Sequence, residues 1–285
     1  MGIALGLTAA LSWGLADYSA ALASRATGTL RVVLGFHLLA TAVLAVVVVA
    51  SGEVDRIGLA DLPGFALVGA IGWVSYLAFY QALAIGPISV ASPIVSGYGA
   101  VTVLLAVVVL GDALGTLEIL AVACALAGVA LASLDPGAVG ALGRVEARGP
   151  LLAVVAMVCI GAFVFGVAYY SEEFGWLVPL FCARAFTTLL LLATSLRSGG
   201  WRFPDRSPRL AASVAFIAFA DTAGYVAFNF GVRHADTAVV ATAATPYSVV
   251  PIVMGVLLLA ERPRLLQWAG IALVLGGLVL LGLGS

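Results

Sequence analysis

Charged side chains are scarce in this sequence, and the shortage excludes most classes of soluble protein. Only 9% of the 285 residues are Asp, Glu, Lys or Arg, whereas a soluble domain carries about 25%. Hydrophobic residues make up 63% of the chain, and the mean hydropathy is +1.18. Because so little polar surface cannot coat a soluble globule, we exclude a soluble enzyme, a disordered chain and a nucleic-acid-binding protein.

Lysine is absent altogether, and histidine and cysteine are rare. The 13 basic residues are all arginine, the net charge is −1, and no charged run marks a charged macromolecular partner. The sequence lacks a Gly-x-x-x-x-Gly-Lys run, so we expect a gradient or exchange, not ATP hydrolysis, to supply energy. The three cysteines, Cys124, Cys159 and Cys182, lie in separate apolar segments. This odd, dispersed set argues against a disulfide framework or a metal site, and we expect no cofactor.

Long apolar stretches are what the sequence has in abundance. A helix needs about 20 apolar residues to cross a bilayer. Ten stretches satisfy this condition: 2–21, 30–50, 62–84, 89–110, 116–134, 150–170, 176–196, 210–232, 237–259 and 265–283. The short breaks between them hold nearly all the charge, and the one uncharged break contains the helix-breaking pair Gly86-Pro87. The sequence therefore predicts an all-α integral membrane protein with ten transmembrane helices.

The distribution of arginine predicts how these spans are oriented. Ten arginines lie in loops that follow odd-numbered spans, two lie in loops that follow even-numbered spans, and Arg184 lies inside a span. Cytoplasmic loops carry the excess of basic residues. We therefore expect a multi-pass protein of the plasma or inner membrane, with its odd-numbered loops in the cytoplasm and both termini outside.

The chain contains an internal repeat. Shifting the sequence by 149 residues brings 76–133 onto 225–282 without a gap. Rare residues match across this shift: Tyr76 with Tyr225, Phe79 with Phe228, Tyr98 with Tyr247 and Gly128 with Gly277. A shift of 147 residues aligns the earlier spans and places His37 opposite Arg184. We infer that the chain consists of two related halves.

Each half contains five of the predicted spans. We place the first repeat at 1–137, a linker loop at 138–148 and the second repeat at 149–285. Because five is odd, the second repeat must enter the membrane upside down relative to the first. Inverted repeats are typical of alternating-access transporters, whose substrate site lies near the midplane between the repeats.

Several motifs resemble those of a known family. The run 80–93 reads Tyr-Gln-Ala-Leu-Ala-Ile-Gly-Pro-Ile-Ser-Val-Ala-Ser-Pro, and Trp13-Gly14 is followed by Asp17-Tyr18 and Ser24-Arg25. Leu110-Gly111-Asp112 and Leu259-Ala260-Glu261 stand where that family has Leu-Gly-Glu. Over nearly its whole length the chain resembles the drug/metabolite transporter superfamily, EamA type. The resemblance implies ten helices, transport and export, and it implies cytoplasmic termini, opposite to the orientation that arginine predicts.

Polar residues inside the spans are candidates for function. A charged side chain at the centre of a span costs roughly 2.5–3.5 kcal/mol, so it persists when paired, hydrated or functional. Arg184 and Asp221 lie near the middle of their spans, and we expect them to pair or to share one cavity. Asp17 lies near the end of its predicted span, where it either functions or reaches the interface by snorkelling.

Helical spacing groups the polar residues into stripes. Asp221, Tyr225 and Asn229 recur every fourth residue, and Gly72, Tyr76 and Tyr80 form the equivalent stripe in the first repeat. Trp13 shares a helix face with Asp17 by the same spacing. Pro93 in the fourth span and Pro246 and Pro251 in the ninth are expected to interrupt their helices, as in many transporter sites.

These patterns predict a substrate-binding site. Its residues are Trp13, His37, Tyr76, Tyr80, Tyr98, Arg184, Asp221, Tyr225, Asn229 and Tyr247. Arg184 would hold an anionic group, Asp221 a cationic group or a proton, and Asp221 and His37 are the candidate coupling residues. Alternatively, Arg184 and Asp221 form a structural staple, His37 is an interhelical hydrogen-bond donor, and the tyrosines only pack. For Asp112 and Glu261 we expect helix capping or a boundary salt bridge, not coupling.

We therefore predict a secondary active transporter that exports small polar or amphipathic metabolites, amino-acid-like or drug-like, by alternating access with proton coupling. The alternatives are a non-transporting membrane subunit and a membrane enzyme acting on lipid-linked substrates. We disfavour an enzyme because no His/Asp/Glu cluster has metal-ligand spacing. The expected partners are a small-molecule substrate, the lipid bilayer and a proton, with no nucleic acid. The apolar spans 116–134 and 265–283 either pair in a homodimer or face lipid.

Overall fold

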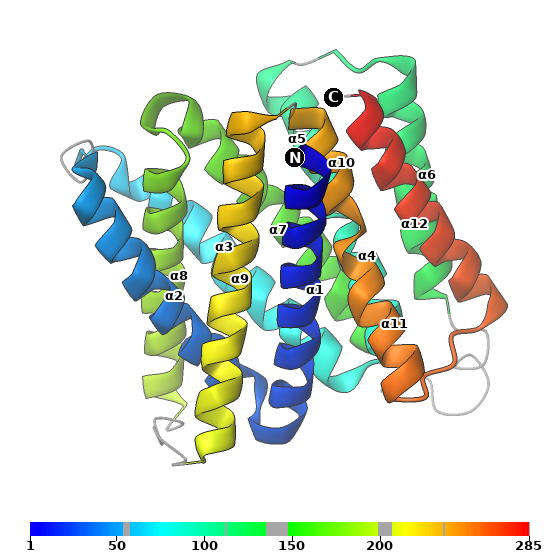
Figure 1. Ribbon diagram of the computed structural model, residues 1–285, viewed down its shortest axis with the longest axis horizontal. Helices are drawn as coiled ribbons and strands as arrows, with labels where there is room; N and C mark the ends of the chain where they lie inside the picture. Colours follow the sequence, from blue (N-terminus) through cyan, green and yellow to red (C-terminus); the bar gives the residue numbers. More distant parts are fainter. Residues whose placement is uncertain (54–57, 112, 135–147, 199–206, 236, 285) are drawn as a thin grey trace.

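The computed structural model describes residues 1–53, 58–111, 113–134, 148–198, 207–235 and 237–284. In this part of the chain every regular element is a helix (Figure 1). The first repeat contains α1 (Gly2–Thr27), α2 (Thr29–Ser51), α3 (Leu62–Ile85), α4 (Ile88–Ser96), α5 (Tyr98–Leu105), η2 (Ala106–Leu110) and α6 (Thr116–Ser133). The second contains α7 (Arg148–Phe174), α8 (Leu177–Arg197), α9 (Pro208–His234), α10 (Thr237–Ala244), η3 (Thr245–Ser248), α11 (Val249–Leu258) and α12 (Leu265–Gly284).

These helices confirm the predicted fold class, an all-α membrane protein with ten spans in two inverted five-helix repeats. Within the described ranges, eight helical segments are long and apolar enough to cross a membrane, among them the interrupted fourth span, Ile88–Leu110. The first span, α1, and the interrupted ninth span, α10 to α11, complete the ten. In Figure 1 the two termini lie at one end of the molecule, and the turn after α1 lies at the other.

The fourth and ninth spans are both interrupted, as expected, but the fourth breaks later than predicted. Pro93 lies inside α4, and the helix continues to Ser96. There the Gly97 N–H donates to the Ile94 carbonyl at 3.1 Å, and the Ser96 hydroxyl donates to the Pro93 carbonyl at 2.8 Å. These short-range bonds tighten the last turn and end α4. In the ninth span the break lies at Pro246, whereas Pro251 lies in the first turn of α11, where its missing N–H costs nothing.

Two glycines show the inverted symmetry in atomic detail. A Cβ atom added to Gly14 in α1 would lie 2.6 Å from the Tyr247 carbonyl oxygen. A Cβ added to its repeat equivalent, Gly161 in α7, would lie 2.8 Å from the Tyr98 carbonyl oxygen. Since Tyr98 and Tyr247 are themselves equivalent, the first helix of each repeat packs closely against the interrupted helix of the other.

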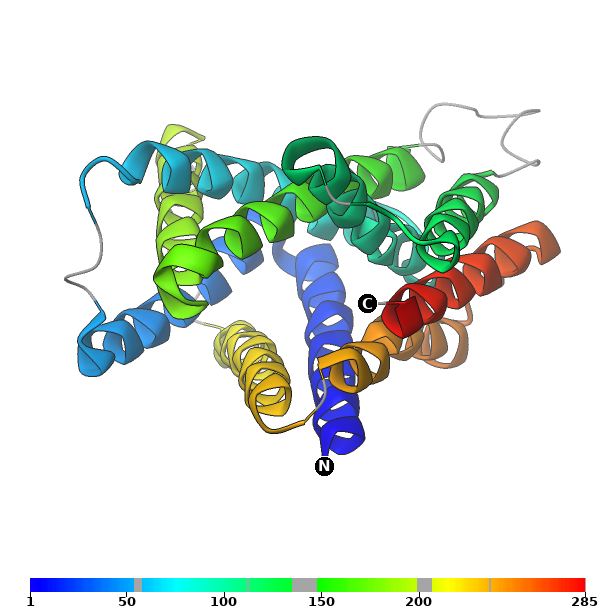
Figure 2. The ribbon, with the colours of Figure 1, turned by 90° about the horizontal axis from the view of Figure 1, so that it is seen from above.

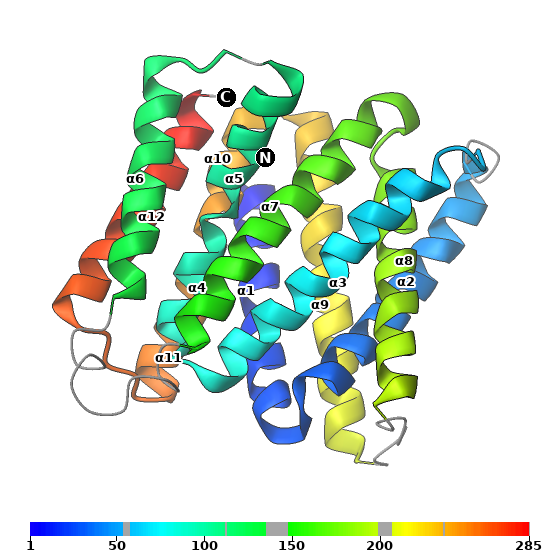
Figure 3. The ribbon, with the colours of Figure 1, turned by 180° about the vertical axis from the view of Figure 1, so that it is seen from behind.

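The last helices of the two repeats, α6 and α12, lie side by side at one edge of the molecule (Figure 3). The two helices pack closely at Gly128, where an added Cβ would lie 2.5 Å from the Val274 nitrogen. The sequence predicted that these two spans either pair in a homodimer or face lipid, and in the structure part of their apolar surface is buried within one chain. In the view of Figure 2, α3 and α7 run side by side on one face, and α1 and α9 lie on the other.

Candidate substrate-binding site

The first helix extends further than the sequence predicted, and this places Asp17 in its central part. We predicted an end at residue 21, but α1 continues to Thr27. Arg25 stabilises this extension because its Nε donates to the Leu83 carbonyl at 3.2 Å and its Nη2 to the Gly86 carbonyl at 2.7 Å. The interpretation of Asp17 as a snorkelling residue is therefore wrong: the side chain is buried, with 7% of the residue exposed.

Arg184 from α8 and Asp221 from α9 form an ion pair. The Arg184 Nη2 lies 2.8 Å from the Asp221 Oδ2, and the two side chains are only 2% and 14% exposed. The Arg184 Cζ also lies 4.9 Å from the centre of the Tyr225 ring, within range of a cation–π interaction. Because each charge neutralises the other, the pair can persist between helices in the bilayer.

His37, the repeat equivalent of Arg184, is fully buried on α2. Its Nδ1 lies 3.0 Å from the Val33 carbonyl oxygen of the same helix. Its ring packs edge-on against Tyr76, with the centroids 4.3 Å apart. His37 therefore contacts Tyr76 in the first repeat as Arg184 contacts Tyr225 in the second, although one residue is an imidazole and the other a guanidinium.

A hydrogen bond from a tyrosine hydroxyl connects α3 to α1. The Tyr80 hydroxyl donates a hydrogen bond to the Asp17 Oδ1 at 3.2 Å. Tyr80 stacks on Tyr76, with ring centroids 6.3 Å apart, and Phe36 packs against both tyrosines. Phe36 was not predicted as a site residue, because its repeat equivalent is an alanine and its side chain has no polar atom.

Trp13 is surrounded by aromatic rings of the second repeat. Its centroid lies 5.3 Å from that of Tyr225, 5.8 Å from that of Phe228 and 6.4 Å from that of Tyr247. Tyr98 adds a further ring, 6.4 Å from Tyr247. Phe228 was not predicted as a site residue, although its match with Phe79 across the repeats was a signal that could have identified it.

Asn229 is the member of the predicted set with the most local role. Its Nδ2 donates to the Tyr225 carbonyl of its own helix at 2.9 Å. Among the described residues, nine of the ten predicted positions contact another helix through a ring contact, an ion pair or a hydrogen bond. The tenth, Asn229, donates its side-chain hydrogen bond within α9.

Three nitrogen atoms of this cluster are buried with neither a hydrogen bond nor an ion pair in the described part of the chain: Trp13 Nε1, His37 Nε2 and Arg184 Nε. Leaving a buried donor or acceptor unsatisfied costs about 1–3 kcal/mol. All three belong to the predicted site, and they come from three different helices. Such a set can offer hydrogen bonds to a small polar molecule.

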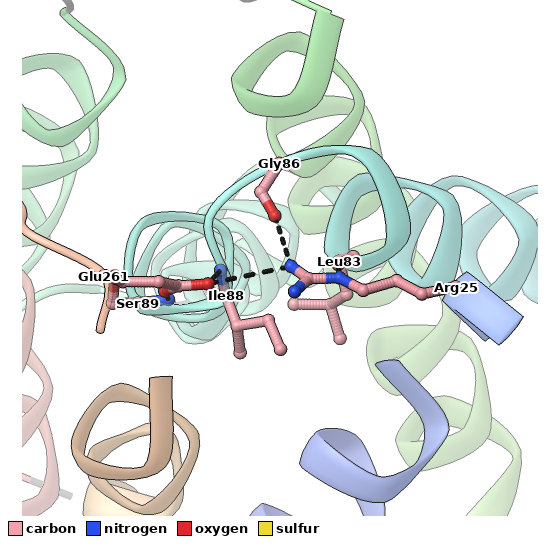
Figure 4. Close-up of polar contacts among 6 residues, drawn as sticks. All are labelled: Arg25, Leu83, Gly86, Ile88, Ser89 and Glu261. Carbon is pink, nitrogen blue, oxygen red and sulfur yellow. Dashed lines mark hydrogen bonds and ion pairs between the residues drawn. The ribbon is translucent and has the colours of Figure 1, made fainter. Parts of the chain in front are cut away.

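Glu261, which follows α11, joins the two repeats through contacts with α4 and α1 (Figure 4). Its Oε1 accepts from the Ile88 N–H at 2.9 Å, and its Oε2 accepts from the Ser89 N–H at 2.8 Å. The Arg25 Nη2 lies 3.6 Å from the same carboxylate. Glu261 therefore caps the first turn of α4 from the other repeat, which confirms the expectation of a cap and boundary salt bridge. Its equivalent, Asp112, lies outside the described residues.

Backbone geometry positions this cap. Ala260 has a φ of 53°, in the left-handed region, and its repeat equivalent Gly111 has a φ of 79°. The Glu261 N–H then donates to the Gly255 carbonyl at 3.1 Å, which closes the end of α11. A residue without a Cβ adopts this conformation most easily, so the alanine at 260 carries local strain.

Comparisons with known proteins agree with this architecture. Residues 1–134 and 147–283 each match the model of a family described as "EamA-like transporter family". A solved structure described only as "Crystal structure of protein" is similar to the chain with a TM-score of 0.59 and 21% identity, covering 98% of this chain and 95% of that one. At this identity the likeness concerns the fold. Among curated proteins, no match was found.

Proposed function

Since the chain belongs to the EamA-like transporter family, a membrane transporter family of the drug/metabolite type, we propose that it is a secondary active transporter working by alternating access. Its cargo in this proposal is a small polar or amphipathic metabolite, amino-acid-like or drug-like, and its direction is export. Its location is the plasma or inner membrane, with the odd-numbered loops in the cytoplasm.

The observation that carries this proposal is the buried polar cluster shared by the two repeats. Trp13 and Tyr98 from the first repeat contact Tyr225 and Tyr247 from the second, beside the Arg184–Asp221 pair. A protein that only packed its helices would not need unsatisfied nitrogen atoms and paired charges at this depth. A site between inverted repeats is where transporters bind their substrates.

The Glu261 contacts support alternating access. They fasten the loop after α11 to the first turn of α4 and to the end of α1, so they join the two repeats at one end. In this proposal that end is closed in the structure, and it opens when Glu261 leaves the α4 amides. A substrate can drive the change only by binding one of the two states more tightly.

Proton coupling through Asp221 and His37 completes the proposal. Protonation of Asp221 would remove its charge and free the Arg184 guanidinium, 2.8 Å away, to hold an anionic group of the substrate. His37 supplies an imidazole whose Nε2 has no partner among the described residues. Both groups thus offer a proton site beside the groups that would contact the substrate.

The test uses purified protein in liposomes with a metabolite mixture and an imposed pH gradient, and mass spectrometry reports what accumulates. We expect one compound class to accumulate with the wild type and with Glu172→Gln, an exposed carboxylate in the last turn of α7. Arg184→Gln and Asp221→Asn should abolish this accumulation. Transport by these variants at the wild-type rate would overturn the assigned site, and pH-driven uptake by Asp221→Asn would overturn its coupling role.

A further inference from the structure

Asp17 and Asp221 are the two carboxylates of the candidate site, and only one of them has a cation beside it. Asp221 pairs with Arg184 at 2.8 Å. In the described part of the chain, no arginine or histidine lies within 4.0 Å of the Asp17 carboxylate. We infer that Asp17 is the cation-binding residue of the site and that the substrate carries an ammonium group. The inference rests on the proposed function and narrows its substrate class.

Burial makes an unpaired charge at Asp17 costly. The residue is 7% exposed, and its one hydrogen bond comes from the Tyr80 hydroxyl at 3.2 Å. A single neutral donor does not replace the hydration of a carboxylate in a hydrocarbon environment. Asp17 therefore needs either a proton or an external cation, and the protein itself supplies no cation close to it.

Aromatic rings around Asp17 suit an ammonium ligand. Trp13 lies one turn away on the same face of α1, and Tyr80 touches the carboxylate itself. The faces of Trp and Tyr rings attract cations, by about 0.5–2 kcal/mol for each favourable contact. A carboxylate within such a set of rings selects a cation with an apolar body over an anion of the same shape.

The ionisable groups that interact electrostatically with Asp17 come from four other helices: Asp221 of α9, Tyr76 and Tyr80 of α3, Tyr98 of α5 and Tyr247 of η3. All of these are acids, and the basic groups nearby are Arg184, which is paired, and His37, which lies against Tyr76. Ligand binding is therefore an exchange. The ammonium enters, the Asp17 carboxyl gives its proton to water, and a carboxylate–ammonium pair remains.

The experiment compares three probes that share a phenyl ring: 2-phenylethylammonium, its neutral N-acetyl derivative, and phenylacetate. Binding to the purified full-length protein is measured by titration calorimetry across a pH series, and proton release is measured in weakly buffered solution. We expect the wild type to bind the cation, to release about one proton per cation bound, and to bind the other two probes at least about tenfold more weakly.

Variants identify the carboxylate responsible. Asp17→Asn should lose at least about tenfold in affinity for the cation, together with the proton release. Asp17→Glu should restore both in part, because it keeps the acid on the same helix face. Glu172→Gln, an exposed acid-to-amide change outside the site, should behave as the wild type. Size-exclusion profiles and thermal unfolding show which variants are folded, and Asp17→Ala, which also removes the carboxylate, replaces Asp17→Asn if the latter is not.

The outcomes separate this inference from the proposed function. Unchanged cation affinity and proton release in Asp17→Asn would overturn the role of Asp17. A wild type that transports metabolites in liposomes but prefers phenylacetate would overturn the ammonium inference and leave the transporter standing. If the protein binds the cation through Asp17 but transports nothing, the ammonium inference is supported and the transport function is overturned.

Discussion

Tyr98 and Tyr247, which occupy equivalent positions in the two repeats, contact each other with ring centroids 6.4 Å apart. Two equivalent residues can touch only where the axis that relates the repeats passes between them. Both lie where a span is interrupted, Tyr98 at the start of α5 and Tyr247 in η3. The candidate site therefore lies at the symmetry axis of the molecule, where a rearrangement of either repeat changes its shape.

The Arg184–Asp221 pair allows a test that separates a staple from a binding group. Arg184→Gln alone should destabilise the protein by about 3–5 kcal/mol, because it leaves the Asp221 charge buried without its partner. The double variant Arg184→Gln/Asp221→Asn should recover most of that loss, as thermal unfolding in detergent will show. If the stable double variant transports normally, the pair is a staple only. If it is folded and inactive, the pair acts on the substrate.

The cap that Glu261 forms on α4 should be visible in hydrogen exchange. Glu261→Ala removes both acceptors of the Ile88 and Ser89 amides. An N-terminal cap contributes about 0.5–2 kcal/mol, so these amides should exchange roughly 2- to 30-fold faster. Glu118→Ala is the matched control, because Glu118 accepts from Gly115 within its own segment at 2.7 Å. Unchanged exchange at the start of α4 in Glu261→Ala would contradict the closing role of this residue.

The strain at Ala260 predicts a stabilising substitution. Its φ of 53° lies in the left-handed region, where a Cβ costs about 1–2 kcal/mol. Ala260→Gly should therefore raise the unfolding temperature in detergent, and Gly111→Ala, at the equivalent position with a φ of 79°, should lower it. A gain in stability from Gly111→Ala would show that the two turns are not equivalent.

The close approach of α1 to the second repeat depends on Gly14. A Cβ at this position would lie 2.5 Å from the Val250 Cβ and 2.6 Å from the Tyr247 carbonyl oxygen. Gly14→Ala should destabilise the protein by about 1–3 kcal/mol through overpacking, and it should displace Trp13 from its aromatic neighbours. Gly276→Ala is the control, since a Cβ there meets nothing within 4 Å. Equal unfolding temperatures for the two variants would contradict this packing.

The orientation in the membrane has a direct test. Five exposed arginines lie in or beside the connections that follow odd-numbered spans: Arg25, Arg148, Arg197, Arg209 and Arg262. If these connections face the cytoplasm, both termini face outward. Alkaline phosphatase fused to the C-terminus should then be active, and a green fluorescent protein fused there should stay dark. The reverse result would establish cytoplasmic termini, as the family resemblance implies.

Much of the fold could be predicted because hydropathy and helical spacing are local properties of the chain. The ten spans, the breaks between them and the polar residues within them follow from runs of neighbouring side chains. The repeat also fixed which residues are equivalent, and so it related His37 to Arg184 before any contact was known. The pairing of Arg184 with Asp221 was expected for an energetic reason, since two lone charges in a bilayer cost more than one neutralised pair.

Tertiary structure decided which of these residues meet. Asp17 was expected near the membrane interface because its helix was predicted to end at residue 21. In the structure the helix continues, and Arg25 stabilises this extension by contacts with the end of α3. These contacts join residues 58 and 61 positions apart. The bond from Ile88 to Glu261 spans 173 positions. The sequence by itself determined how many helices cross the membrane and which are equivalent. Packing between distant helices decided that Asp17 is buried beside Tyr80 and that Glu261 caps the opposite repeat, because a side chain's partner depends on how whole helices fit together.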